Sequence, residues 1–157
     1  NRQTGCQMDL DQLMRQVTER KYRPGAYAVE YDRFSFIYQF IARNVERNGQ
    51  HVQVVLLSME LPKDREISLE RIEDSLVLLE SAIVRSLRRG DVTSRFSSTQ
   101  QVVVLMDASK EDGVMVANRI LKKYNTLAKE AAITARFDIV EVPHAFSKRT
   151  EKNEEKA

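Results

Sequence analysis

Two arginines and an aspartate have side chains suited to binding an anion, if the fold brings them together. Arg88 and Asp91 belong to the segment Arg88-Arg-Gly-Asp91, and Arg119 lies further along the chain. A guanidinium group is a planar fork that meets a phosphate, or the N7/O6 edge of a guanine, with two parallel hydrogen bonds. The simpler interpretation is structural, because Gly90-Asp91 is also a natural helix-to-strand turn in which the aspartate bonds to the backbone.

Other polar side chains of the sequence give weaker indications of a catalytic or metal-binding site. The hydroxyl groups of residues 97–99 would need a nearby base to act as nucleophiles, and no histidine is close to them in the sequence, so we expect no catalytic triad. His51 precedes a predicted strand and His144 follows the last one. With these two histidines and the single cysteine, Cys6, we expect no metal cluster. Glu60 is most simply an acid on the surface at a strand end.

The composition is that of an ordinary folded domain. The 157 residues suffice for one domain with a core, and 42% are hydrophobic and 31% charged. The formal net charge of +2 is too small to favour nucleic acid or an anionic membrane as the main partner. No membrane span or secretory signal is apparent, which favours a reducing cytoplasm. A chain that begins with Asn also fits a fragment of a larger protein.

Hydrophobic spacing predicts the order helix, helix, strand, helix, hairpin, helix, strand. The expected helices cover 9–20, about 34–48, 69–88 and 111–129, and the expected strands cover 52–61, 92–96, 101–106 and 133–142. Asn48-Gly49 indicates a left-handed helix end, and we expect Gly90 to close the 69–88 helix, the longest one. This order favours an α/β fold of the α+β sandwich type, with helices packed on a mixed central sheet.

The hairpin is the most informative stretch of the chain. The segment Val92–Phe96 is expected to pair with Gln101–Met106 across Ser97-Ser98-Thr99-Gln100, a polar loop of hairpin length. We expect residues 1–24 to form an N-terminal helix and linker, residues 25–143 the domain, and residues 144–157 a disordered charged tail.

This hairpin and its surroundings resemble the signature region of GGDEF domains, the diguanylate cyclases, which have a nucleotidyl-cyclase-like fold. In that family an Arg-Phe/Tyr pair precedes the Gly-Gly-Asp/Glu-Glu-Phe signature, and Arg95-Phe96 matches this pair. Further segments that resemble the family, in the same order, are Gly25–Tyr27, Ile41–Gly49, Val54–Glu60 and Ala117–Ile120. The resemblance runs from about residue 25 to residue 142. It implies that the hairpin lies centrally in the sheet beside residues 52–61, with Ser58 near residues 97–100.

The resemblance also implies a loss of chemistry. Active members hold two Mg²⁺ ions with a carboxylate at the end of the first strand and another in the hairpin, because hard cations need anionic oxygens. Ser58 and Thr99 stand at those positions, and the family's Gly-Gly turn is replaced by Ser97-Ser98, with Gln100 following Thr99. The family's last helix, with its phosphate-binding lysine, has no counterpart. We therefore expect a degenerate domain that is not an enzyme and has no catalytic residue, metal or cofactor.

One regulatory motif is retained in the resemblance. Arg88 and Asp91 match the family's Arg-x-x-Asp inhibitory site for cyclic di-GMP, and Arg119 matches a second arginine that assists it. This implies an inactive sensory or interaction domain of a bacterial signalling or regulatory protein, which binds cyclic di-GMP and contacts the other domains of its parent protein. The alternatives are a ligand-free structural module that forms a homodimer and, as the least favoured one, a residual enzyme acting on nucleoside triphosphates.

Overall fold

The computed structural model describes residues 7, 9–19 and 25–144. The elements in chain order are α1 (Leu10–Val17), β1 (Tyr27–Ala28), α2 (Tyr31–Asn48), β2 (Gln53–Glu60), α3 (Leu69–Ser86), β3 (Val92–Ser97), β4 (Gln100–Leu105), α4 (Lys110–Leu127) and β5 (Thr134–Glu141). The predicted order of helices and strands is confirmed. The short strand β1 is an addition that the sequence did not indicate.

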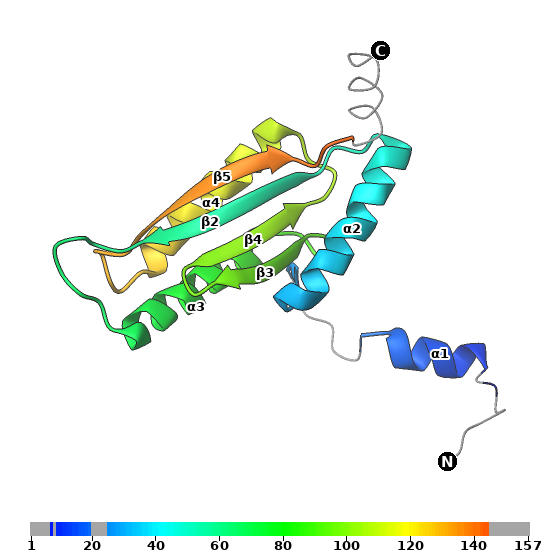
Figure 1. Ribbon diagram of the computed structural model, residues 1–157, viewed down its shortest axis with the longest axis horizontal. Coiled ribbons are helices and arrows are strands. Elements are labelled where there is room, and N and C mark those ends of the chain that lie inside the picture. Colours follow the sequence, from blue (N-terminus) through cyan, green and yellow to red (C-terminus); the bar gives the residue numbers. More distant parts are fainter. Residues whose placement is uncertain (1–6, 8, 20–24, 145–157) are drawn as a thin grey trace, which may run out of the picture.

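The strands form one mixed sheet in the order β1-β3-β4-β2-β5. Strand β2 lies between β4 and β5 and is antiparallel to both, whereas β1 pairs with β3 in parallel. The β3–β4 hairpin therefore lies beside β2, as expected from the sequence (Figure 1).

The sheet is covered on both faces. Helices α3 and α4 pack on one face through a core that includes Leu76, Leu79, Ile120 and Tyr124. Helix α2 covers part of the opposite face (Figure 1). Its residues Phe34, Ile41 and Val45 lie on one side of the helix and pack with valines of β3 and β4. The predicted fold class, an α+β sandwich with a mixed central sheet, is confirmed.

The helix ends follow local chemistry. Asp9 caps α1 in a capping box with Gln12, and the hydroxyl groups of Ser68 and Ser109 cap α3 and α4. Helix α2 ends at Gly49, whose φ of 68° places it in the left-handed region, as predicted.

Three details differ from the sequence-based expectation. Helix α3 ends at Ser86 with Leu87 as its cap in extended conformation, so Gly90 does not close it. Helices α2, α3 and α4 all have 18 residues, so α3 is not the longest. The hairpin turn spans residues 98–99 rather than 97–100, because β3 continues to Ser97 through an irregularity at residue 96.

Some expectations fall on residues that the structure does not describe. These are the disordered tail from residue 145 on, Cys6, and most of the break after the first helix. Among the described residues, none of the helices combines the length and the apolar character needed to span a membrane.

Candidate functional site

The three residues that the sequence singled out lie around one cavity. Arg88, Asp91 and Arg119 line an open cavity of about 240 Å³, which we call the arginine pocket. Its other walls come from the ends of α3 and β4, the loop after β4 and the first half of α4. The residues that complete the lining are Ser86, Leu87, Leu105, Asp107, Ala108, Asp112, Met115 and Val116.

Asp91 organises the backbone beneath this pocket. The residue is only 2% exposed. Its two carboxylate oxygens accept hydrogen bonds from the backbone N–H groups of Arg88 (3.0 Å) and Met106 (3.0 Å). The turn after α3 is thereby tied to the end of the hairpin. This is the structural role that the sequence offered as the simpler interpretation of Asp91.

The two arginines that line the pocket come from different elements. Arg88 lies in the turn after α3, and Arg119 lies on α4. Arg88 donates from Nη2 to the carbonyl oxygen of Met106 at 2.7 Å, and Arg119 donates from Nη2 to the carbonyl oxygen of Ser86 at 2.8 Å. A guanidinium group has five N–H donors, so one bond to a carbonyl leaves donors for another partner. The bond to a carbonyl oxygen therefore does not use all the donors of either group.

The pocket also contains acidic groups at its rim. Asp107 and Asp112 are exposed and line the same cavity as the arginines. Asp107 has a φ of 49°, in the left-handed region, where the chain turns from β4 toward α4. The rim thus offers hydrogen-bond acceptors beside the guanidinium donors, a combination that suits a ligand with both acceptor and donor edges.

The positions matched to the family's metal ligands meet at the other end of β2 and β4. The Gln100 side chain donates from Nε2 to Oγ of Ser58 at 3.1 Å, and the N–H of Met59 donates to the carbonyl oxygen of Thr99 at 2.8 Å. Ser97 donates from Oγ to the Gln100 side-chain oxygen at 2.9 Å. The predicted proximity of Ser58 to residues 97–100 is therefore confirmed, and Ser98 occupies the tight turn between them.

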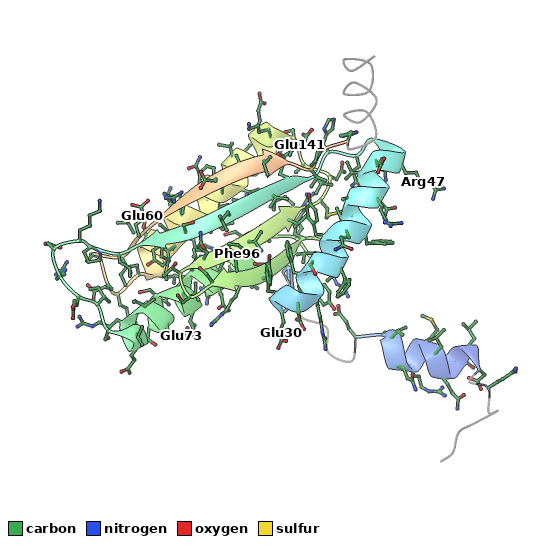
Figure 2. All side chains as sticks on the ribbon, in the orientation of Figure 1. Glu30, Arg47, Glu60, Glu73, Phe96 and Glu141 are labelled. Carbon is green, nitrogen blue, oxygen red and sulfur yellow. The ribbon has the colours of Figure 1, made fainter. Side chains whose placement is uncertain are left out.

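Glu60 lies further along the same end of the sheet. Its carboxylate pairs with Nε of Arg136 on the neighbouring strand β5 at 2.7 Å. Figure 2 shows Glu60 and Glu141 at opposite ends of the β2–β5 pair. The expectation that Glu60 is a surface acid at a strand end is confirmed by its exposure.

Arg95, the arginine of the matched Arg-Phe pair, joins the hairpin to α3. Its guanidinium lies 3.0 Å from the carboxylate of Glu73 and also forms an ion pair with Glu80. These contacts raise the pKa of Arg95, chiefly through the hydrogen bond with Glu73. The neighbouring Phe96 packs against the Tyr31 ring of α2 at a centroid distance of 5.4 Å.

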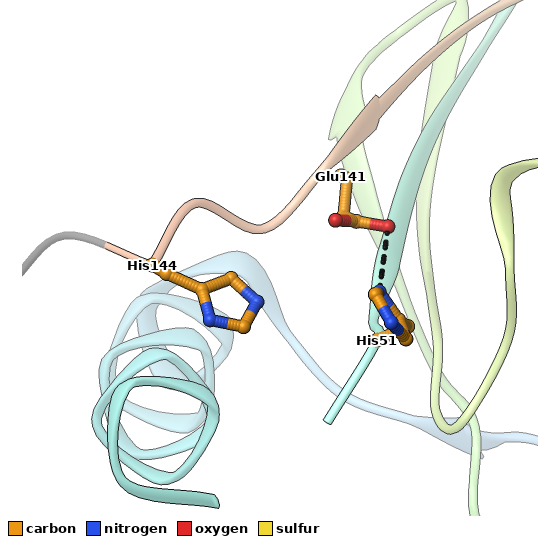
Figure 3. Close-up of side chains that lie close together, drawn as sticks. All are labelled: His51, Glu141 and His144. Atoms are coloured by element: carbon orange, nitrogen blue, oxygen red, sulfur yellow. Dashed lines mark hydrogen bonds and ion pairs between the residues drawn. The ribbon is translucent and has the colours of Figure 1, made fainter. Parts of the chain in front are cut away.

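The structure brings together two histidines that the sequence left apart. His51, just before β2, lies 3.2 Å from the Glu141 carboxylate (Nδ1 to Oε1) at the end of β5, and the rings of His51 and His144 are 6.3 Å apart (Figure 3). A hydrogen bond from Gln53, assisted by the two histidines, lowers the pKa of Glu141 below its usual value. The sequence places the two histidines 93 positions apart, and the pairing of β2 with β5 aligns their segments.

The first helix has an apolar side that the domain does not cover. Leu10, Leu13, Met14 and Val17 recur at helical spacing on α1, and all are exposed.

Comparison with known proteins identifies the fold. No protein-family model matches the chain, and no curated protein matches it in sequence. Solved structures do match. A DGC protein from Thermotoga maritima has a TM-score of 0.60 and 16% identity, covering 75% of this chain and 82% of that one. The GGDEF domain of DgcB from Caulobacter crescentus, in complex with c-di-GMP, has a TM-score of 0.56 and 10% identity, with 79% and 78% covered. The active GGEEF domain of a diguanylate cyclase from Vibrio cholerae has a TM-score of 0.51 and 13% identity, with 67% and 71% covered.

One expectation from the sequence is overturned by this comparison. We expected the chain not to be an enzyme, whereas the structures that share its fold are diguanylate cyclases, and one of them is described as active. The expectation of an inactive domain is therefore not retained. The mixed five-stranded sheet, the helices on its two faces and the hairpin beside β2 give this chain the GGDEF-type, nucleotidyl-cyclase-like fold.

Proposed function

We propose that this domain is a regulatory module of cyclic di-GMP signalling that binds the dinucleotide at the arginine pocket. The observation that carries the proposal is the convergence of Arg88 and Arg119 on one open cavity, from the turn after α3 and from α4. Each guanidinium already donates a hydrogen bond to a backbone carbonyl, which reduces the number of side-chain conformations that a ligand would have to order.

The chemistry of the pocket matches both parts of a guanine nucleotide. The two guanidinium forks suit a phosphate group or the N7/O6 edge of guanine. The N1–H and N2–H groups of guanine need acceptors, which the exposed carboxylates of Asp107 and Asp112 supply. Asp91 then acts beneath the ligand by holding Arg88 and Met106, since its oxygens already accept two backbone N–H groups.

The size of the cavity limits how the ligand sits. Pockets that enclose drug-sized ligands measure roughly 300–1,000 Å³. The arginine pocket, at about 240 Å³, is smaller and open to solvent. It is too small to enclose a whole dinucleotide, so part of the ligand would stay in contact with solvent.

Calorimetric titration of tag-free protein with cyclic di-GMP tests this proposal. A charge-assisted contact contributes roughly 1.5–3 kcal/mol, so Arg88→Ala and Arg119→Ala should each weaken binding about tenfold or more. The matched control is Arg89→Ala, which removes the same charge one residue away and does not line the pocket. Absence of binding by the wild type, or equal losses in Arg88→Ala and Arg89→Ala, would rule out this site.

Formation of cyclic di-GMP from GTP and Mg²⁺ is measured on the same samples, because the proteins of similar fold include diguanylate cyclases.

A second candidate function, self-association, is favoured by α1. A stripe of four exposed apolar side chains on a short helix is a surface that a second copy of this helix would cover. Sedimentation velocity during the titration separates the two candidates, since self-association through α1 is lost in Leu13→Glu, whereas ligand binding at the arginine pocket is not.

A further inference from the structure

Three potential metal ligands meet at one end of the β2–β5 pair. Ser58, which matches a metal-ligand position of GGDEF domains, lies toward the other end of β2. The three potential ligands are His51, Glu141 and His144, and one ligand atom from each lies within 4.8 Å of the others. His51 comes from the segment before β2, Glu141 ends β5, and His144 follows it (Figure 3). Ligands from chain segments so far apart in sequence are brought together only by the folded sheet.

The spacing is close to that of a tetrahedral metal centre. Zinc binds histidine nitrogen and carboxylate oxygen at about 2.0–2.2 Å, which places neighbouring ligand atoms about 3.3 Å apart in a tetrahedron. His51 Nδ1 and Glu141 Oε1 are already 3.2 Å apart. The ligand atom of His144, a partly buried residue just beyond the strand, lies within 4.8 Å of the other two, so binding of an ion requires its ring to move closer.

A buried residue supports the carboxylate from behind. Gln53 is 0% exposed, and its Nε2 donates both to Glu141 Oε1 at 2.9 Å and to the carbonyl oxygen of Ala108 at 3.0 Å. These two acceptors fix which way the amide points. Hydrogen bonds of this kind orient the ligands in metal sites and contribute to their affinity.

We propose that His51, Glu141 and His144 bind a divalent transition metal ion, with water in the open position. Imidazole ligands suit zinc, copper and nickel, whereas magnesium and calcium prefer oxygen ligands. Two imidazoles and one carboxylate form a ligand set that zinc uses in proteins when one position remains open. None of the three ligands lines the arginine pocket, and the edge that carries Ser58 lies at the other end of β2.

Zinc is the probe that tests this site. The protein used is tag-free, has been treated with chelator and carries Cys6→Ser. This substitution removes the thiol as a competing ligand. Because the chain has only two histidines, a ¹H–¹⁵N spectrum of the imidazole nitrogens contains two ring systems. Both should shift together as zinc is added, with an end point at one equivalent. A single shifting ring would show ordinary surface binding and overturn the proposal.

Affinity measurements on variants complete the test. His51→Gln, His144→Gln and Glu141→Gln should each weaken zinc binding by at least about tenfold, the lower limit seen even for supporting residues. The matched control is Glu60→Gln, the same change at the far end of β2, which should leave the zinc affinity unchanged. Thermal unfolding in chelator shows that each variant is folded. Zinc affinity that is unchanged in Glu141→Gln, or equally reduced in Glu60→Gln, would overturn the proposal.

Discussion

Substituting alanine at three glycines separates two contributions to the free energy of unfolding. One comes from a close approach of two backbone segments, and the other from a backbone conformation that favours glycine. Gly25 has a φ of 86°, and a Cβ added there would lie 2.5 Å from the carbonyl oxygen of Val84 in α3 and 2.9 Å from its Cγ1. Gly49 has a similar φ of 68°, but a Cβ there meets nothing within 4 Å. Gly90 has open space and no positive φ.

The expected losses of stability follow from these differences. Both Gly25 and Gly49 have a positive φ, where an L-residue costs about 1–2 kcal/mol. Only Gly25→Ala adds a clash with a helix backbone, worth roughly 1–3 kcal/mol by analogy with overpacked cores. We therefore expect unfolding free energies lower by about 1–2 kcal/mol for Gly49→Ala and about 2–5 kcal/mol for Gly25→Ala. Gly90→Ala should stay within about 0.5 kcal/mol of the wild type.

Urea unfolding followed by circular dichroism measures all four proteins under the same conditions. A change in the midpoint at constant slope reports a change in stability alone. Equal midpoints for Gly25→Ala and Gly49→Ala would refute the reasoning, because the larger loss expected for Gly25→Ala depends on the contact with Val84. That result would mean that the chain leading into β1 does not dock against α3.

The remaining predictions concern Tyr124, whose side chain is fully buried and donates from its hydroxyl to the carbonyl oxygen of Ile133 at 3.1 Å. Tyr124→Phe leaves that carbonyl without its partner and should lower the unfolding free energy by about 1–3 kcal/mol in urea titrations, with Tyr31→Phe, at an exposed position, as the control. Burial raises the pKa of the Tyr124 phenol above its ordinary value of 10.0, against the opposite effect of a hydrogen bond with Ser75. The folded state then holds this proton more tightly than the unfolded state, so stability should fall as the pH rises above about 10. This loss should be smaller in Tyr124→Phe, and an identical pH profile would show that Tyr124 ionises freely in the fold.

Helices and strands with a repeated pattern of apolar residues could be predicted from the sequence. A strand that is defined only by its backbone hydrogen bonds to a neighbouring strand could not. Helix α2 and strand β2 carry their pattern in the sequence, through Phe34, Ile41 and Val45 at helical spacing and through the valines that begin β2. Strand β1 has two residues and no pattern. It exists because the N–H of Tyr27 donates to the carbonyl oxygen of Asp91, which requires β3 to be in place.

Some features of the two candidate sites could also be predicted from the sequence, and others could not. The arginine pocket was indicated by a short motif and a resemblance, but the burial of Asp91 and the presence of Asp107 and Asp112 at its rim depend on how the loop after β4 turns. The histidine cluster had no local signal at all, since His51 and Glu141 are 90 positions apart. Only the register of β2 with β5 brings them together, and a single sequence does not display that register.

The same pairing has a consequence for the order in which the domain folds. Within the β3–β4 hairpin, Thr93 and Val102 meet across 9 positions, whereas Gln53 and Glu141 meet across 88. Because loop-closure entropy grows with the logarithm of loop length, bringing β5 to β2 costs about 2 kcal/mol more than closing the hairpin. The hairpin and the helices are therefore expected to form first, leaving one side of β2 as an open edge until the last strand docks. During synthesis, β2 leaves the ribosome long before β5, so its unpaired backbone is the stretch most exposed to pairing with another chain.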